Sequence, residues 1–264
     1  MSSIRKMAAT ASSAVSTSAI NPSWAEASDQ EEILWALERH ARSYNEWILQ
    51  RALPFVGRRV LEAGAGVGTF TRMLAQADRR VLANELDDNF AAILEDRVRS
   101  LPNVDVFRDD ILRLSPGTLG GPVDSIICFN VLEHIPDDAG ALAAMRRCLC
   151  PGGQLLLLVP AHPFLFGATD LAVDHQRRYA RGALNDLLSR TGFEIVHLRY
   201  VNAVGAAGWL VSSRLLRRTT LPAGLLDLFG RLVPLLRSLD RVVPLPFGLS
   251  LWARAARPGD HTVA

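Results

Sequence analysis

Residues 59–69 decide the fold, and they read R-V-L-E-A-G-A-G-V-G-T. The apolar run at 59–63 is typical of a short strand, and the glycines after it indicate a sharp turn into a helix. Glycine has no Cβ and tolerates positive φ, so a ligand can approach this backbone closely. The spacing is G-x-G-x-G, and Thr69 stands where the dinucleotide fingerprint G-x-G-x-x-G needs its third glycine. The turn therefore argues against NAD or FAD as the ligand.

Two acidic residues accompany this turn. Glu62 stands just before the glycines, and Glu85 ends the next expected strand. A carboxylate at the first position favours a zwitterionic ligand over a pyrophosphate. At the second position an acidic side chain can accept hydrogen bonds from both hydroxyls of a ribose. The pattern favours a zwitterionic, sulfonium-bearing ligand that also contains a ribose.

Strands and helices alternate outward from the turn, which predicts an α/β fold of the Rossmann-like, doubly wound type. The expected sheet is mostly parallel, with helices on both faces and a helical cap at residues 29–53. We expect a helix N-cap at Asp88. Strands are expected at 59–63, 81–85, 104–107, 125–129, 155–159, 194–199 and 249–255, and helices at 69–77, 88–101, 139–149 and 181–191.

The segment at 202–247 interrupts this alternation. It is rich in leucine and arginine and is punctuated by prolines, which indicates two or three helices inserted before the last strand. Four interpretations stay open. The insertion could form a wall or lid over a hydrophobic acceptor pocket, mediate homodimer contact, rest on a membrane surface with its arginines at anionic headgroups, or simply pack on the sheet.

Composition limits the remaining choices. Residues 1–28 are rich in Ser, Ala and Thr and are expected to be a disordered tail, which leaves 29–264 as a single domain. The net charge of +2 argues against a dedicated nucleic-acid partner. No apolar run reaches the roughly 18 residues of a membrane-spanning helix. Three cysteines give no disulfide framework, so we expect a cytoplasmic location.

Several motifs in their order along the chain resemble the class I S-adenosylmethionine (SAM)-dependent methyltransferases. The stretch 60–68 resembles their first motif, 130–137 (N-V-L-E-H-I-P-D) the segment after their fourth strand, and 150–153 (C-P-G-G) their late turn. The similarity covers roughly residues 55–200. It implies SAM as cofactor, bound by Tyr44, Glu62, Gly64, Gly66, Gly68, Glu85, Leu86, Asp110, Ile111, Asn130 and Val131.

Individual roles follow from the same resemblance. Asp110 would take the exocyclic amine of adenine while Ile111 packs on the ring. Tyr44, on the N-terminal helix, would fold over the bound cofactor, and core packing is its alternative role.

The sequence restricts the identity of the methyl acceptor less than that of the cofactor. Residues 62–87 also resemble the ribosomal-RNA adenine dimethylases, but those enzymes carry N-x-P-Y or N-x-P-F after the fourth strand, and this chain has N-V-L-E. The runs at 160–163 and 174–179 resemble a bacterial subgroup from natural-product pathways. We therefore expect methylation of a small or amphiphilic acceptor in bacterial secondary metabolism. An rRNA adenine N-methyltransferase and a non-catalytic SAM-fold binding protein remain alternatives.

Methyl transfer from a sulfonium is an in-line displacement, so the protein must mainly align the acceptor, the methyl group and the sulfur. An O- or N-acceptor that carries a proton also needs a base. The candidates are His134, His162 and His175, with Tyr179 beside the last. His175, Arg178 and Tyr179 would share a face if this stretch were helical. We expect no metal site, because Glu133-His134 alone is too small a ligand set.

Overall fold

The structure is a computed structural model, and it describes residues 35, 38–39, 42–76, 78–218, 224, 230–233, 237 and 246–259. The expected tail at 1–28 lies outside the described residues, as does most of the expected insertion beyond residue 218. Among the described residues, no helix has the length and apolar character needed to cross a membrane.

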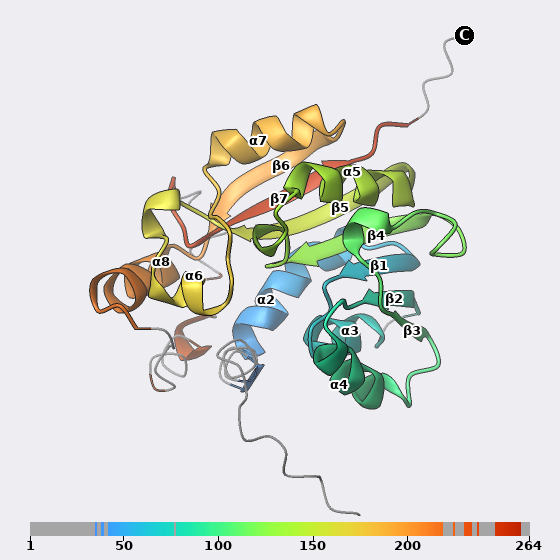
Figure 1. Cartoon of the computed structure of the whole chain (residues 1–264), viewed down its shortest axis with the longest axis horizontal. Coiled ribbons are helices and arrows are strands. Elements are labelled where there is room, and N and C mark those ends of the chain that lie inside the picture. Colours follow the sequence, from blue (N-terminus) through green and yellow to red (C-terminus); the bar gives the residue numbers. More distant parts are fainter. Residues whose placement is uncertain are drawn as a thin grey trace, which may run out of the picture.

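A seven-stranded sheet organises the described chain, in the order β3-β2-β1-β4-β5-β7-β6 (Figure 1). The pairs from β3 to β5 are parallel, whereas β7 runs antiparallel to both β5 and β6. The prediction of a mostly parallel, doubly wound sheet is confirmed. The strands are Arg59–Ala63 (β1), Arg80–Asn84 (β2), Val104–Phe107 (β3), Val123–Phe129 (β4), Leu149–Pro160 (β5), Glu194–Val201 (β6) and Ser250–Ala256 (β7).

Helices cover both faces of this sheet. Alternate residues of β4 show why the central strands are apolar throughout: Ile126 belongs to the core under α5 and α7, and Ile127 to the core under α2 and α3. Both side chains are fully buried, as expected for a strand covered on each face. The helices are Arg42–Ala52 (α2), Thr69–Leu74 (α3), Asp88–Val98 (α4), Asp138–Cys148 (α5), Ala168–Ala172 (α6), Arg181–Arg190 (α7) and Ala203–Trp209 (α8).

Short 3-10 turns follow α2 and three of the strands, and those after the strands carry residues of the candidate site. They are Leu53–Phe55 (η1), Ile111–Arg113 (η2), Leu132–His134 (η3) and Pro163–Leu165 (η4). The described start of the expected insertion is α8, continued by a π-helix at Leu210–Leu215 (η5). Ser213 on η5 accepts a hydrogen bond from the backbone N–H of Thr169, so this part of the insertion packs against α6.

The expected cap of α4 is corrected by one residue. Asp87, not Asp88, is the N-cap, and its Oδ1 accepts hydrogen bonds from the backbone N–H groups of Asn89 and Phe90. Asp87 has extended backbone dihedrals, which is the conformation that lets a short acidic side chain reach the first turn. Asp88 lies in that first turn, where its charge favours the helix dipole.

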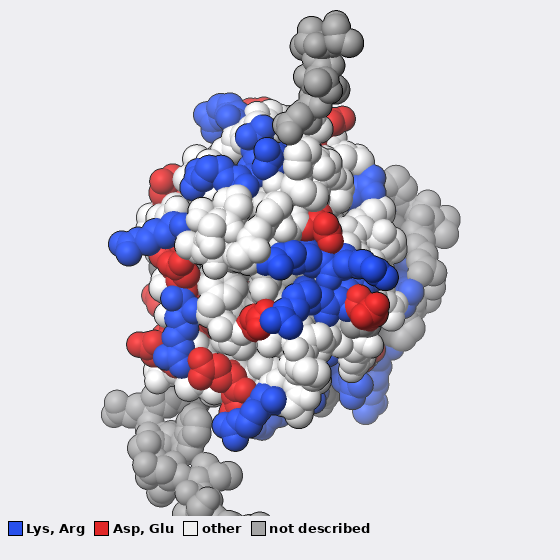
Figure 2. Space-filling model, turned by 90° about the vertical axis from the view of Figure 1, so that its right-hand side faces the viewer, with Lys and Arg blue, Asp and Glu red and all other residues white. Residues whose placement is uncertain are grey.

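The edge of the sheet where β1 and β2 begin carries charges of both signs. Arg58, Arg59, Arg79 and Arg80 line a shallow depression there with Asp78 and Asn103. Figure 2 faces this side and shows basic and acidic side chains interspersed. Arg80, for example, pairs with Asp105 at 2.5 Å. This face therefore presents no broad field of one sign.

Candidate functional site

The glycine turn lies between β1 and α3, and its three glycines have different surroundings. Gly64, Gly66 and Gly68 all have positive φ, at 73°, 53° and 83°. A Cβ on Gly64 would meet Cγ2 of Val131 at 2.5 Å, and one on Gly68 would meet Leu94 at 2.6 Å. A Cβ on Gly66 would meet no described atom within 4 Å. Packing therefore requires glycine at 64 and 68, whereas at 66 the bare backbone borders open space.

Glu85 closes the turn from the end of β2. One oxygen of its carboxylate accepts the backbone N–H of Gly66 at 2.7 Å, and the other accepts that of Asp87 at 2.9 Å. Burial raises the pKa of Glu85, and these backbone hydrogen bonds work against the rise. The carboxylate is thus held beside the open position of the turn, where the sequence predicted a partner for ribose hydroxyls.

Glu62 is more deeply enclosed than the sequence suggested. Its carboxylate accepts a hydrogen bond from the Thr71 hydroxyl at 2.6 Å, and the side chain is buried. Burial, aided by the nearby charge of Glu85, raises the pKa of Glu62 to about 8. Its direct hydrogen bond supports the first turn of α3.

Asp110 and Ile111, which were expected around adenine, follow β3, and Leu86 follows β2. Asp110 is the N-cap of η2, and its Oδ1 accepts the backbone N–H of Leu112 at 2.9 Å. Ile111 is buried, whereas Leu86 is 64% exposed. An apolar side chain that lies open beside Glu85 suits the flat face of a base.

Asn130 and Val131 follow β4 directly. Asn130 has a φ of 53°, and its backbone N–H donates to the carbonyl of Leu158 at 2.8 Å. The Val131 side chain lies against Gly64, as described above. The segment after β4 is therefore packed onto the glycine turn.

Tyr44 on α2 lies near the carboxyl end of β5, where β6 ends and β7 begins. Burial raises the pKa of its hydroxyl, which hydrogen bonds with the side chains of Ser250 and Asn202. Its ring also contacts Trp47 edge-to-face at 5.8 Å between centroids. These contacts tie α2 to the end of β6 and the start of β7.

Glu38, which sequence reasoning missed, links the N-terminal region to the glycine turn. Its carboxylate accepts hydrogen bonds from Arg97 at 2.7 Å and from the Thr69 hydroxyl at 3.1 Å. Arg97 also donates to the carbonyl of Val67 at 2.8 Å. Burial acts to raise the pKa of Glu38, but Arg97 and Thr69 outweigh it and the pKa is lowered. No sequence motif marks this glutamate.

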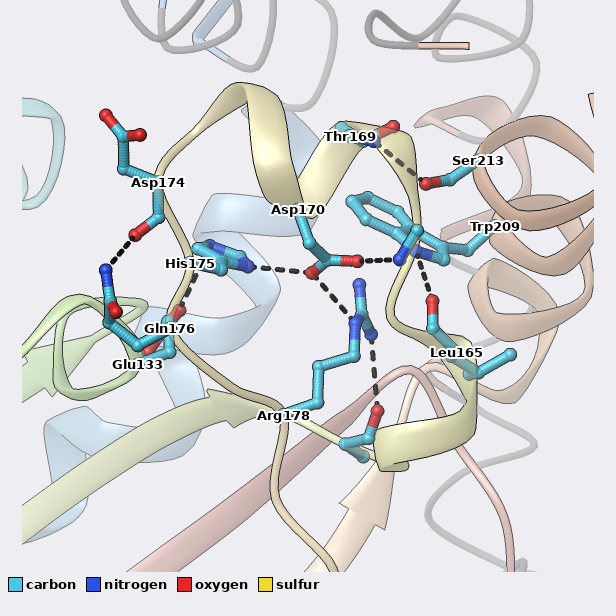
Figure 3. Close-up of polar contacts among 12 residues, drawn as sticks. Glu133, Leu165, Thr169, Asp170, Asp174, His175, Gln176, Arg178, Trp209 and Ser213 are labelled. Atoms are coloured by element: carbon cyan, nitrogen blue, oxygen red, sulfur yellow. Dashed lines mark hydrogen bonds and ion pairs between the residues drawn. The ribbon is translucent and has the colours of Figure 1, made fainter. Parts of the chain in front are cut away.

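Asp170, also missed, is the centre of a buried network in the segment after β5 (Figure 3). Its Oδ1 receives hydrogen bonds from His175 Nδ1 and Arg178 Nε, each at 2.8 Å, and its Oδ2 from the backbone of Gly167 at 2.9 Å. Burial acts to raise the pKa of Asp170, but His175 and Arg178 outweigh it and the pKa is lowered. The guanidinium of Arg178 also lies over the Trp209 ring.

The expected helical face of His175, Arg178 and Tyr179 is wrong. Helix α6 ends at Ala172, and the chain after it is not helical, with Asp174 at a φ of 57°. Asp170, rather than helical spacing, brings His175 and Arg178 together. The Tyr179 hydroxyl instead donates to Asp138 Oδ2 at 3.0 Å, which ties it to the start of α5.

Glu133 and His134, on η3 after β4, lie beside His175. Nε2 of His175 is 3.7 Å from Oε1 of Glu133, and the two histidine rings meet edge-to-face at 4.7 Å. Burial raises the pKa of Glu133 to about 8. Burial, together with the neighbouring His175, lowers the pKa of His134 to about 4. Two segments far apart in the sequence therefore place three polar side chains at the carboxyl ends of β4 and β5.

His162 follows β5 but belongs to an aromatic stack. Its ring stacks on the rings of Tyr200 and Phe247, with centroid distances of 4.7 Å and 4.3 Å. Its φ is 61°, an unusual value for a residue other than glycine. Burial, with the charge of Arg178, lowers the pKa of His162. The ring contacts of His162 are therefore with Tyr200 and Phe247, and not with the cluster of Glu133, His134 and His175.

The chain is similar to known proteins in sequence and in fold. A methyltransferase domain family matches residues 37–198. A probable S-adenosylmethionine-dependent methyltransferase of Mycolicibacterium smegmatis is 32% identical over 168 residues, 62% of this chain and 61% of that protein. A ubiquinone biosynthesis O-methyltransferase of Methylococcus capsulatus is 29% identical over 107 residues, 40% of this chain and 45% of that protein. The chain thus spans less than two thirds of the length of these relatives.

A solved structure shows the same architecture. Phosphoethanolamine N-methyltransferase 2 of Haemonchus contortus, in complex with S-adenosyl-L-methionine, superposes with a TM-score of 0.59 at 18% identity, covering 89% of this chain and 58% of that one. At this identity the likeness bears on the fold alone. With the family match over residues 37–198, the chain belongs to the class I SAM-dependent methyltransferases.

Proposed function

We propose that the chain transfers the methyl group of SAM to a small or amphiphilic acceptor. The observation that carries this proposal is the open backbone at Gly66, with the Glu85 carboxylate fixed beside it. In a member of this family, that combination fits an adenosyl amino acid with its ribose on Glu85. SAM supplies an activated methyl group on a sulfonium, so the chain's task is alignment.

The described residues fit SAM at each part of the molecule. Glu85 offers two carboxylate oxygens to the ribose hydroxyls. The exposed Leu86 would offer apolar surface to adenine, and Asp110 directly precedes Ile111 at the start of η2. The turn at 64–68 leads into the N-terminus of α3, where the helix dipole favours a carboxylate.

We place the acceptor's reacting group beside Glu133, His134 and His175. Open α/β folds bind ligands at the carboxyl ends of their strands, and this polar cluster follows β4 and β5 there. Of the four expected catalytic residues, His134 and His175 belong to this cluster. The bond from Tyr179 to Asp138 and the stacking of His162 favour packing roles for those two residues.

The described surface near this edge supports an acceptor with an apolar part. Phe164 on η4 is 59% exposed, and η5 exposes Val211 and Leu215. Exposed apolar side chains near a polar cluster would suit an amphiphilic molecule. The assignment to bacterial secondary metabolism rests on the resemblance of residues 160–163 and 174–179.

Two linked measurements test the proposal. Calorimetric titration with SAM and, separately, NADH should give binding heat with SAM; heat with NADH alone would end the proposal. Turnover with isotopically labelled SAM across phenols, indoles, prenyl compounds and sugars should then identify the product that gains the label. Binding of SAM with no labelled product from any acceptor class would favour a non-catalytic SAM-binding protein.

A further inference from the structure

Three side chains with metal-binding chemistry converge where β4 and β5 end. Glu133, His134 and His175 each offer one ligand atom, and these atoms all lie within 4.8 Å of one another. Glu133 and His134 come from η3, whereas His175 comes from the loop after α6. The donors are two imidazoles and a carboxylate, a set that suits divalent first-row transition metals.

The Glu133 carboxyl group lacks the partners that its position demands. The residue is 0% exposed, and neither carboxylate oxygen receives a hydrogen bond from any other residue that the structure describes. Nε2 of His175 lies 3.7 Å from Oε1 of Glu133, beyond hydrogen-bond distance. A buried carboxyl group without hydrogen-bond partners is energetically unfavourable. A cation between Glu133 and the two histidines would remove that cost.

Asp170 gives His175 the orientation that a metal ligand needs. A ligating histidine commonly donates its other ring N–H to a carboxylate, which fixes the tautomer and aims the free nitrogen at the metal. His175 Nδ1 lies 2.8 Å from Asp170 Oδ1, so its Nε2 is directed toward Glu133 (Figure 3). Asp170 is itself held by Arg178 and by the backbone of Gly167. The supporting carboxylate is therefore rigidly placed.

We infer that Glu133, His134 and His175 bind a divalent transition-metal ion of the Zn²⁺ class. Metal–ligand bonds of about 2.0–2.2 Å put tetrahedral ligand atoms roughly 3.4 Å apart. The distance from His175 to Glu133 is close to this at 3.7 Å. No spacing among the three ligand atoms exceeds 4.8 Å, so binding would shorten any of them by at most roughly 1.4 Å, within the reach of small side-chain rotations.

This inference revises the expectation of no metal site. The sequence offered Glu133-His134 alone, and the third ligand comes from a distant segment that only the fold brings near. Three protein ligands leave one position of a tetrahedral site open. If the proposed methyl transfer holds, an acceptor oxygen would take that position; the metal site itself does not depend on this step.

Metal binding can be measured directly on the whole chain. The protein is treated with a chelator, dialysed and titrated with Zn²⁺ by calorimetry, and with Co²⁺ by visible absorption. We expect one ion per chain, with Co²⁺ bands that report nitrogen and oxygen ligands. Glu133→Gln and His175→Gln should each abolish stoichiometric binding. Asp170→Asn, which spares the three ligands, should weaken affinity by about 10–100-fold.

The matched control is His197→Gln, because His197 is an exposed histidine on β6 outside the cluster. It should bind Zn²⁺ like the unmodified chain, and circular dichroism should show every variant folded. If one variant unfolds, the other two still decide the question. Absence of stoichiometric binding in the folded chain, or equal binding by all variants, would overturn the inference.

Titration of the same samples with SAM separates this inference from the proposed function. Zn²⁺ binding without SAM binding would leave the metal site intact and remove the proposed methyl transfer. SAM binding and turnover that persist without any Zn²⁺ or Co²⁺ binding would do the reverse.

Discussion

Replacing Gly66 with alanine should separate cofactor binding from folding. Gly66 has a φ of 53°, and a Cβ there would meet no described atom within 4 Å. The cost to the fold is then the left-handed backbone alone, roughly 1–2 kcal/mol. At 2–4 °C for each kcal/mol in a chain of this size, the unfolding midpoint should fall by roughly 2–8 °C.

The effect on SAM should be larger than the effect on the fold. The added methyl group projects into the space where we place the ligand, so it removes a close backbone contact. Loss of about 1.4 kcal/mol weakens binding tenfold, and we expect at least this loss for Gly66→Ala. Calorimetry with SAM measures the affinity, and circular dichroism during heating measures the midpoint.

Gly152 supplies the matched control. It lies in the turn of β5 at the opposite edge of the sheet, has a φ of 78°, and a Cβ there would also meet no described atom within 4 Å. Gly152→Ala should therefore cost similar stability and leave SAM affinity unchanged. Unchanged affinity in Gly66→Ala, or an equal loss in both variants, would refute the placement of the cofactor.

Three other substitutions test contacts around the site. Gly64→Ala puts a Cβ 2.5 Å from Val131 and should destabilise the fold by roughly 1–3 kcal/mol beyond the backbone strain. Adding Val131→Ala should restore part of this stability. A double variant whose thermal unfolding shows no recovery would contradict this prediction. Because the pKa of Glu62 is raised from 4.5 to about 8, its contribution to stability is complete below pH 4.5 and declines as pH rises toward 8, on the order of 1 kcal/mol per pH unit. Glu62→Gln should flatten the unfolding free energy over that range, and an unaltered slope in denaturant titrations would count against the buried, neutral carboxyl. Tyr179→Phe removes the bond to Asp138 and should cost about 1 kcal/mol with SAM affinity and turnover kept. Loss of turnover in a variant of unchanged stability would instead indicate that the Tyr179 hydroxyl takes part in the reaction.

Local sequence signals correctly predicted the strands around the glycine turn. The strand at 59–63 and the strand at 104–107 have the same bounds as β1 and β3. Their apolar runs and the glycines between β1 and α3 are local features that need no tertiary information. The cap of α4 was displaced by one residue, because Asp87 and Asp88 are equally suited chemically and only the backbone dihedrals distinguish them.

The pairing of strands that are far apart in the sequence could not be predicted in the same way. The sequence indicated a last strand at 249–255 but not its neighbours, and β7 lies antiparallel between β5 and β6. Sheet order depends on contacts between segments far apart in the chain, for which periodicity carries no signal. Most of the expected insertion at 202–247 lies outside the described residues.

The polar cluster shows the same limit. Spacing at 175, 178 and 179 suggested a helical face, but the chain there is not helical and the hub is Asp170. A single aspartate in the five-residue helix α6 has no periodic pattern. The one local signal was its position three residues after Gly167, where an acidic side chain can accept the backbone N–H at a helix start.

The central claim is that an adenosyl amino acid lies on the glycine turn with its ribose on Glu85. A crystal structure of the chain with S-adenosylhomocysteine tests it most directly. We expect both ribose hydroxyls on the Glu85 carboxylate, the amino-acid part beside Gly66, and adenine between Leu86 and Ile111. Density for the ligand at any other place on the molecule would contradict the account.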